Sequence, residues 1–195
     1  MPETTTRRPS PSERRLRVID SFIDVLLEGG VPTADEVAER ADVSMATLFR
    51  YFATLDEIRH DAMARVLDRF PHLFTLPDSA VGDREQRIRS FVAARLDLHE
   101  ALHALQLLQR ASAVRDPRAA ELVHNSRLMM AEQTGRHFEP ELRDLTPARR
   151  ESLLATLDLV TSVESWQTFR VSFDQPIART RRAWFDAVDH LLPPH

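Results

Sequence analysis

The chain has 195 residues, of which 43% are hydrophobic, so it can bury a core in one or two domains. Its net charge is −4, and it has no cysteine, which excludes disulfides and thiolate metal sites. No apolar run approaches the roughly 20 residues of a membrane span, and residues 1–10 lack the apolar core of a signal peptide. We therefore expect a soluble, cytoplasmic protein.

Helical signals dominate the sequence. There are only 4 glycines and no strand-like alternation, so we predict an all-α fold. The first helix is predicted to begin after Ser10, which has capping-box spacing to Glu13 and precedes a proline. Gly29 and Gly30 end it. Its apolar residues recur every three or four positions, at Leu16, Ile19, Phe22, Ile23 and Leu26.

Residues 33–52 predict two short helices joined by a tight turn. Thr33 and Glu36 have capping-box spacing at the start of the first helix. Asp42 stands in the turn, where aspartate tolerates a left-handed backbone, and Ser44 can cap the second helix. The first helix carries a small apolar face, formed by Val37, Ala38 and Ala41.

The second of these helices has one inward side and one free side. Leu48 and Phe52, four residues apart, are predicted to pack inward. Ala46 and Thr47 are small enough to approach DNA bases, and Thr47 offers both a hydroxyl and a methyl group. The free side consists of Met45, Ala46, Thr47 and Arg50. This pattern predicts a helix that enters the major groove of DNA.

The run T-A-D-E-V-A-E-R-A-D-V-S-M-A-T-L-F-R-Y-F, followed by A-T-L-D-E-I, begins at Thr33. With it, residues 10–70 resemble the DNA-binding domain of the TetR family of bacterial transcriptional regulators. The resemblance implies that Met45, Ala46 and Thr47 approach base edges. It also implies phosphate contacts from Thr33, Ser44, Phe49, Arg50 and Tyr51.

Three positions depart from the family's usual residues. Asp42 replaces a turn glycine, Phe49 replaces a tyrosine, and Leu55 replaces a lysine, so two phosphate donors are lost. Residues 1–17 carry five arginines against two glutamates. We predict that they form a basic arm beside the reading helix, in which Arg14, Arg15 and Arg17 contact phosphates. Residues 1–9 are predicted to be a flexible N-terminal tail. The alternative to phosphate contact is that these arginines only solubilise a loose tail.

The rest of the chain is predicted to be helical. A connector helix from Thr54 to Phe70 precedes a linker at 71–82, and residues 71–195 then form a ligand-binding and dimerisation domain. Aspartate or threonine caps, most of them followed by proline, start its helices. We expect helices from Asp83 through Leu108, with a break, from Pro117 to Phe138, from Pro147 to about Phe173, and from Pro176 to about Leu191.

The helix predicted at 147–173 is apolar nearly all round, so it must be covered on more than one side. A second copy of the chain can supply that cover, and the TetR resemblance implies a dimer through the last two long helices. The alternative is an enclosed core helix in a monomer. The candidate interface residues are Leu153, Leu157, Val160, Trp184, Val188 and Leu191.

His99, Glu100 and His103 form a literal H-E-x-x-H sequence, which on a helix is the layout of a zinc protease. Glu121 is a distant candidate for a third ligand. Since nothing else in the sequence supports hydrolysis, we predict no metal, no cofactor and no enzymatic activity. Histidines that are incidental or line a pocket are the favoured interpretation, with a regulatory metal site or an α-helical metalloenzyme as alternatives.

We therefore predict a ligand-responsive, sequence-specific DNA-binding regulator, most simply a repressor that releases a palindromic operator when a small molecule binds residues 83–173. The rival hypothesis is a helix-turn-helix regulator without a small-molecule ligand. The ligand pocket is implied by the resemblance, and plain packing is the alternative for each of its candidate residues. These candidates are His103, Gln106, Met129, Met130, Phe138, Trp166 and Phe169.

Overall fold

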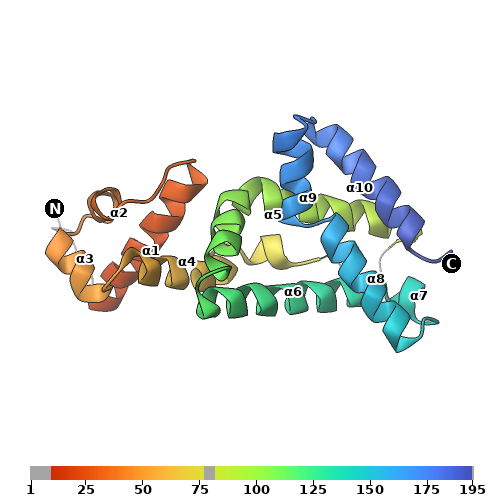
Figure 1. Ribbon diagram of the computed structural model, residues 1–195, viewed down its shortest axis with the longest axis horizontal. Coiled ribbons are helices and arrows are strands. Elements are labelled where there is room, and N and C mark those ends of the chain that lie inside the picture. The colour runs from red at the N-terminus through yellow and green to blue at the C-terminus, as the bar shows by residue number, and fades with distance from the viewer. Residues whose placement is uncertain (1–9, 77–81, 195) are drawn as a thin grey trace, which may run out of the picture. The chain divides into compact units, whose positions relative to one another are not determined.

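The computed structural model describes residues 10–76 and 82–194, and every regular element in these ranges is helical (Figure 1). The all-α prediction is therefore confirmed. The chain divides into two compact units, Met1–Arg69 and Phe70–His195. Within the described ranges, no helix combines the length and hydrophobicity that a bilayer crossing requires.

Two predicted segments lie outside the described residues. One is the flexible tail predicted at 1–9, which includes Arg7 and Arg8 of the predicted basic arm. The other is residues 77–81 of the predicted linker. The roles assigned to residues 10–70 and 71–195 stay predictions.

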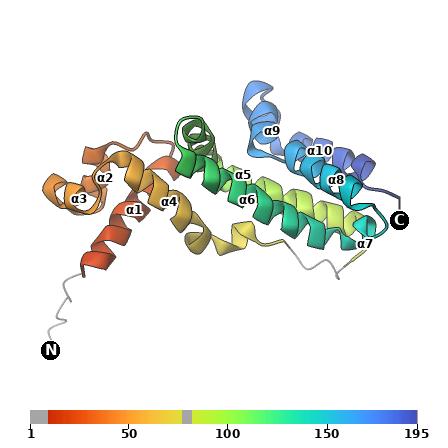
Figure 2. The same cartoon turned by 60° about the horizontal axis from the view of Figure 1, so that its bottom comes forward.

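The described part of the N-terminal unit contains α1 (Pro11–Leu27), α2 (Ala34–Arg40), α3 (Met45–Tyr51) and α4 (Leu55–Arg69). α1 packs along α4, and it also contacts α2 and α3 (Figure 2). Most of the apolar residues predicted to face inward do so, but Leu16 is 42% exposed. The fully enclosed side chains include Val18, Ile23, Val37, Leu48 and Ile58.

Caps set the helix boundaries in this unit. The Ser10 hydroxyl accepts from the Glu13 amide at 3.2 Å, and the Glu13 carboxylate accepts from the Ser10 amide at 2.5 Å. At the end of α1, Gly29 has a φ of 83° and lies in a Schellman motif. α2 ends in the same motif with Asp42, whose φ is 53°. The capping box predicted at Ser10 and the left-handed turn predicted at Asp42 are both present, whereas only the threonine half of the box predicted for Thr33 and Glu36 is formed.

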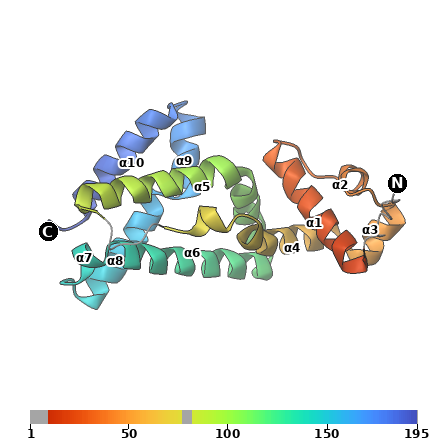
Figure 3. The ribbon, with the colours of Figure 1, turned by 180° about the vertical axis from the view of Figure 1, so that it is seen from behind.

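In the described part of the second unit, α5 lies at the centre, with α6 and α10 on opposite sides (Figure 3). α5 is assigned as one helix, but it changes direction in its second half, near the break predicted from the sequence (Figure 1). Residues 139–142, predicted as part of a loop, form the short helix α7 instead. The bounds are η1 Pro71–Phe74, α5 Arg84–Ala113, α6 Pro117–His137, α7 Glu139–Leu142, α8 Pro147–Val160, α9 Val163–Gln167, η2 Thr168–Ser172 and α10 Ile177–Leu191.

The prediction of a single long helix from Pro147 to Phe173 is wrong. α8 ends at Val160, and Ser162 starts α9 as its N-cap, with its hydroxyl accepting from the Ser165 amide at 3.1 Å. The Thr161 hydroxyl donates to the Leu157 carbonyl at 2.7 Å. Serine and threonine hydroxyls compete with the helical backbone hydrogen bonds, and this adjacent pair interrupts them.

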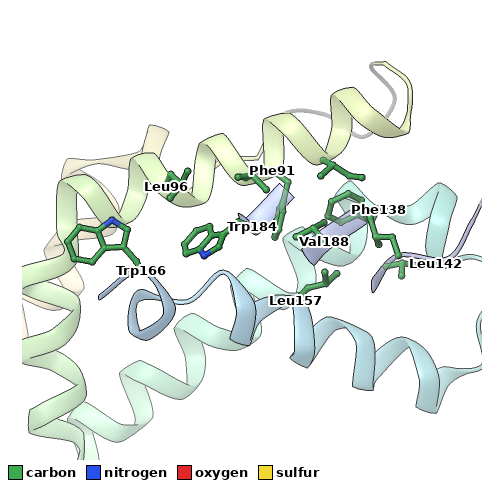
Figure 4. Packing of buried hydrophobic residues seen from close by; sticks show 11 residues of the cluster. Phe91, Leu96, Phe138, Leu142, Leu157, Trp166, Trp184 and Val188 are labelled. Carbon is green, nitrogen blue, oxygen red and sulfur yellow. The ribbon is translucent and has the colours of Figure 1, made fainter. Parts of the chain in front are cut away.

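The core of the second unit corrects part of the predicted dimer interface. Leu157 and Val188 are fully buried, and Trp184 is 1% exposed, so none of the three has surface for a second copy (Figure 4). Leu153, Val160 and Leu191 are partly buried and pack against the same core. The buried residues shown are Ile88, Phe91, Val92, Leu96, Phe138, Leu142, Leu157, Trp166, Trp184, Val188 and Leu192.

The two Schellman motifs of the N-terminal unit yield a stability prediction. Asp42→Gly should stabilise the fold by about 0.5–1 kcal/mol, because a left-handed residue other than glycine is strained. Thermal unfolding measures this change. Asp42→Ala is the control and should destabilise. A glycine variant that unfolds at or below the parent's temperature would show that Asp42 carries no such strain.

Candidate nucleic-acid interface

The two sides of α3 differ sharply in burial. Leu48 is fully buried and Phe52, at the C-cap, is 1% exposed, so one side is fixed in the core of the N-terminal unit. On the other side, Ala46 and Arg50 are exposed, and Met45 is partly exposed. The predicted reading face is therefore accessible.

Thr47 is oriented by the cap of the same helix. The Ser44 hydroxyl accepts from the Thr47 amide at 3.2 Å and donates to the Thr47 hydroxyl oxygen at 3.0 Å. Because that oxygen already accepts a proton, the Thr47 hydroxyl hydrogen can point elsewhere and donate. Thr47 is partly exposed, so this hydrogen can reach a hydrogen-bond acceptor outside the protein.

The residues predicted to contact phosphates all have some exposure. Thr33 is exposed at the N-cap of α2, where its hydroxyl accepts from the Glu36 amide at 3.2 Å. Phe49 is 47% exposed. The Arg50 guanidinium lies 5.3 Å from the ring centroid of Tyr51, which is partly exposed. This contact directs Arg50 along the surface of α3.

The three candidate arginines of α1 have different environments. Arg15 forms an ion pair with Asp61 of α4, and its guanidinium lies 4.7 Å from the Phe52 ring centroid. It therefore ties α1 to α4 and to the end of α3. Arg17 is exposed and Arg14 is partly exposed. Arg14 and Arg17 are thus the better placed candidates for an outside phosphate.

The H-E-x-x-H residues are engaged in packing the second unit. His99 is 3% exposed, with Nε2 lying 2.9 Å from the Thr161 carbonyl and Nδ1 lying 2.8 Å from Oε1 of Gln106, whose side-chain amide can be turned so that its nitrogen faces the ring instead. In a continuous helix the Ser165 amide would donate to the Thr161 carbonyl. Here that amide donates to the Ser162 hydroxyl instead, which leaves the Thr161 carbonyl available. A neutral ring can donate from Nε2 and accept at Nδ1 once the Gln106 amide is oriented to donate.

The other two residues of this sequence contact α9. Glu100 accepts from Trp166 Nε1 at 2.8 Å and from Arg170 Nε at 2.9 Å. The His103 ring stacks on Trp166 with centroids 4.4 Å apart. Glu121, on α6, is exposed. Among the described residues, no group of three or more His, Cys, Asp or Glu could bind a metal ion.

The predicted ligand residues differ in burial. Phe138 is fully buried in the core, whereas Met129 and Phe169 are only partly buried. A groove of about 980 Å³ runs between α5 and α10 and includes none of the candidates. Its lining combines four arginines with three acids and four apolar residues, namely Arg84, Glu85, Arg89, Val92, Ala93, Asp97, Ala178, Arg181, Arg182, Phe185 and Asp189.

Comparison with solved structures decides the fold. A TetR-family transcriptional regulator from Streptomyces coelicolor matches with a TM-score of 0.71 at 20% identity, over 92% of this chain and 80% of that one. The chain has the TetR fold. The multidrug binding protein EbrR, complexed with imidazole, shares this fold with a TM-score of 0.60 at 20% identity, over 96% of this chain and 98% of that one.

Sequence comparison agrees with the TetR resemblance noted for residues 10–70, which is confirmed. The HTH-type transcriptional repressor KstR of Mycolicibacterium smegmatis is 31% identical over 122 residues, which cover 60% of this chain. The match spans 59% of the length of that repressor. No protein-family profile matches the chain.

Two features of this fold were not predicted from the sequence. One is the groove between α5 and α10, which depends on how two distant helices pack. The other is Arg95, which is 3% exposed although arginines usually reach solvent. A signal was available for it: Arg95 lies one turn after Phe91 and one turn before His99 on a continuous inward side of α5.

His99 predicts a pH dependence of stability. Burial, the largest cause, lowers the pKa of His99 from 6.5 to about 4. Between these values the unfolded chain binds a proton that the folded chain excludes, so stability is lost as the pH falls. Acidification from pH 7 to pH 4.5 should therefore cost about 2–3 kcal/mol through this group, measured by denaturant unfolding.

His99→Gln is the matched control, since glutamine can still donate to the Thr161 carbonyl but does not titrate. The variant should lose less stability than the parent over the same pH interval, whatever its stability at pH 7. Parallel pH profiles for the two proteins would contradict this assignment.

Proposed function

We propose that this chain is a sequence-specific DNA-binding transcription regulator of the TetR type. The observation that carries the proposal is the division of α3: Leu48 and Phe52 are buried, while the side that includes Thr47 is accessible. The similarity to a helix-turn-helix repressor supports the same conclusion. A regulator of this kind acts in the cytoplasm and has no enzymatic activity.

The first turn of α3 reads base edges. Met45 and Ala46 offer apolar contact to thymine methyl groups, and the Thr47 hydroxyl donates to an acceptor such as O4 of thymine or O6 of guanine. Arg50, Thr33 and the Ser44 cap contact phosphates and fix the register of α3 on the duplex. Phe49 and Tyr51 pack beside the backbone, and Arg14 and Arg17 add charge.

The regulator functions as a homodimer through α8 and α10. A groove of about 560 Å³ between these helices is lined by two of the predicted interface residues, Leu153 and Leu191. Val160 is partly exposed at the end of α8 and Leu159 is 66% exposed beside it, so this end of α8 has apolar surface that a second copy can cover. A twofold dimer carries two copies of α3 and matches a palindromic operator.

The regulator is a repressor that a small molecule releases from DNA. The predicted pocket residues come from α5, α6 with its C-cap, α9 and η2. The protein EbrR, which has the same fold, is complexed with a small molecule, imidazole. A ligand that binds one dimer conformation more tightly shifts the population away from the DNA-bound conformation. The change in DNA affinity is limited by that difference in binding free energy.

DNA binding is tested by selecting duplexes from a random library and measuring the affinity of the best one across salt concentrations. Arg50→Gln should weaken all sequences alike, by about 1–2 kcal/mol, and lower the salt slope by about 1. Thr47→Ala should instead lower the preference for one base pair by about 1–3 kcal/mol.

Arg40→Gln is the control, because the Arg40 guanidinium is already bonded to Glu28 of the same unit. It should leave both affinity and salt slope unchanged. If no duplex is enriched, or if Arg50→Gln and Arg40→Gln behave alike, the assignment of α3 as the reading helix is wrong.

The dimer proposal predicts the effect of a charge on α8. Leu159→Arg should convert the dimer to a monomer in multi-angle light scattering at micromolar concentration, with little change in thermal stability because the side chain is exposed. Leu128→Arg, at a residue on α6 that is 57% exposed, is the matched control and should stay dimeric. A parent protein that is monomeric, or a dimeric Leu159→Arg variant, would refute this interface.

A further inference from the structure

Two arginines are buried on the inward side of α5, and they are compensated in different ways. Arg87 is 6% exposed, and its Nε donates to Glu141 Oε1 at 3.0 Å, in an ion pair with a carboxylate whose side chain is fully buried. Arg87 Nη1 also donates to the Gly82 carbonyl at 2.8 Å. Arg87 is thus neutralised within the fold.

Arg95, two turns further along α5, is 3% exposed but bonds only to neutral acceptors. Its Nη2 donates to the Thr134 hydroxyl at 2.8 Å and to the Met130 carbonyl at 3.3 Å, and Nη1 donates to the Met130 sulfur at 2.9 Å. Nε has no acceptor. None of the described carboxylates lies within ion-pairing distance of Arg95, in contrast to Arg87.

The charge of Arg95 is therefore poorly compensated. Burial lowers its pKa to about 10, and the distant Asp158 on α8 opposes this shift only in part. At neutral pH the side chain is still a cation. Burying a charge without a counter-ion opposes folding, and native folds usually compensate such a charge with an ion pair. Arg95 has the properties of a receptor for an anion that the fold itself does not supply.

We infer that Arg95 binds the carboxylate of an apolar organic acid that inserts between α5 and α6. The inference rests on the proposed ligand-responsive function and names the class of its ligand. A carboxylate can accept from Nε and Nη2 together, in the side-on bidentate geometry that suits a guanidinium. On Nη2 it would take the place of the Met130 carbonyl, the more distant of that nitrogen's two acceptors, and this carbonyl would still accept from the Thr134 hydroxyl.

The surroundings of Arg95 favour a hydrocarbon body for the acid. The guanidinium lies 5.2 Å from the Phe91 ring centroid, and Leu102 is buried further along α5. His103 Nδ1, on the same helix, is another of the buried atoms that lack a partner. It lies eight residues after Arg95, about 12 Å along a helix. An acid with a hydroxyl or carbonyl group at its far end would satisfy both positions.

The first test compares the stability of two variants without any added ligand. Arg87→Met should lower the melting temperature by roughly 10 °C, because it leaves the Glu141 carboxylate buried and unpaired. Arg95→Met should leave the melting temperature unchanged or raise it, because it removes an uncompensated charge. If Arg95→Met is destabilised as strongly as Arg87→Met, Arg95 has a structural role and the inference is overturned.

The second test uses defined probes on the full chain. Sodium benzoate, decanoate and dodecanoate should raise the melting temperature and bind in calorimetry, whereas benzamide, decanol and dodecanol should not. Arg95→Lys, which keeps the charge but loses the planar fork, should bind the acids at least tenfold more weakly. Arg95→Met should not bind them. No acid binding, equal binding of acids and neutral probes, or unchanged binding by either variant would overturn the inference.

These outcomes are separable from those of the DNA experiments. A protein that selects a duplex but binds no acid retains the proposed regulatory function and loses only the acid ligand. A protein that binds acids through Arg95 but selects no duplex retains the acid site and loses the regulatory function.

Discussion

The burial of Leu48 and Phe52 is the constraint on which the proposed DNA-binding surface depends. These two side chains fix one side of a seven-residue helix in the core of the N-terminal unit, so the opposite side has to face outward. Arg15 strengthens that attachment, because it pairs with Asp61 of α4 and covers the Phe52 ring. If the orientation of this short helix relative to the core could vary, its contacts with base edges would be poorly defined, since base readout depends on a fixed register on the duplex.

The second unit is organised around polar groups buried along α5. Arg87 is compensated by a carboxylate, and Arg95 has only neutral acceptors. His99 is neutral and contacts the Thr161 carbonyl, where α8 ends. For Arg87 and His99, contacts within the fold offset the free-energy cost of burying a polar group. Arg95 leaves a charge to be matched from outside, which is the arrangement expected where a protein exchanges fold stability for ligand affinity.

Local rules predicted much of the N-terminal unit from sequence. Capping boxes and a glycine C-cap depend on residues within four or five positions of each other, so the ends of α1, the turn at Asp42 and the inward side of α3 could be predicted. In the second unit the same rules placed most helix starts. They missed the break at Thr161 because an apolar run can continue as a helix or bend around adjacent hydroxyl residues.

The helical class and the inward side of α3 could be predicted from the residues alone, because they follow from periodicity and short-range hydrogen bonds, and the family resemblance rests on the residue run that begins at Thr33. Long-range packing decides which apolar residues are enclosed: Leu157, Trp184 and Val188 have the pattern of interface residues but fill the core. It also decided the environments of His99 and Arg95, since compensation of a buried charge depends on residues distant in sequence that packing brings near.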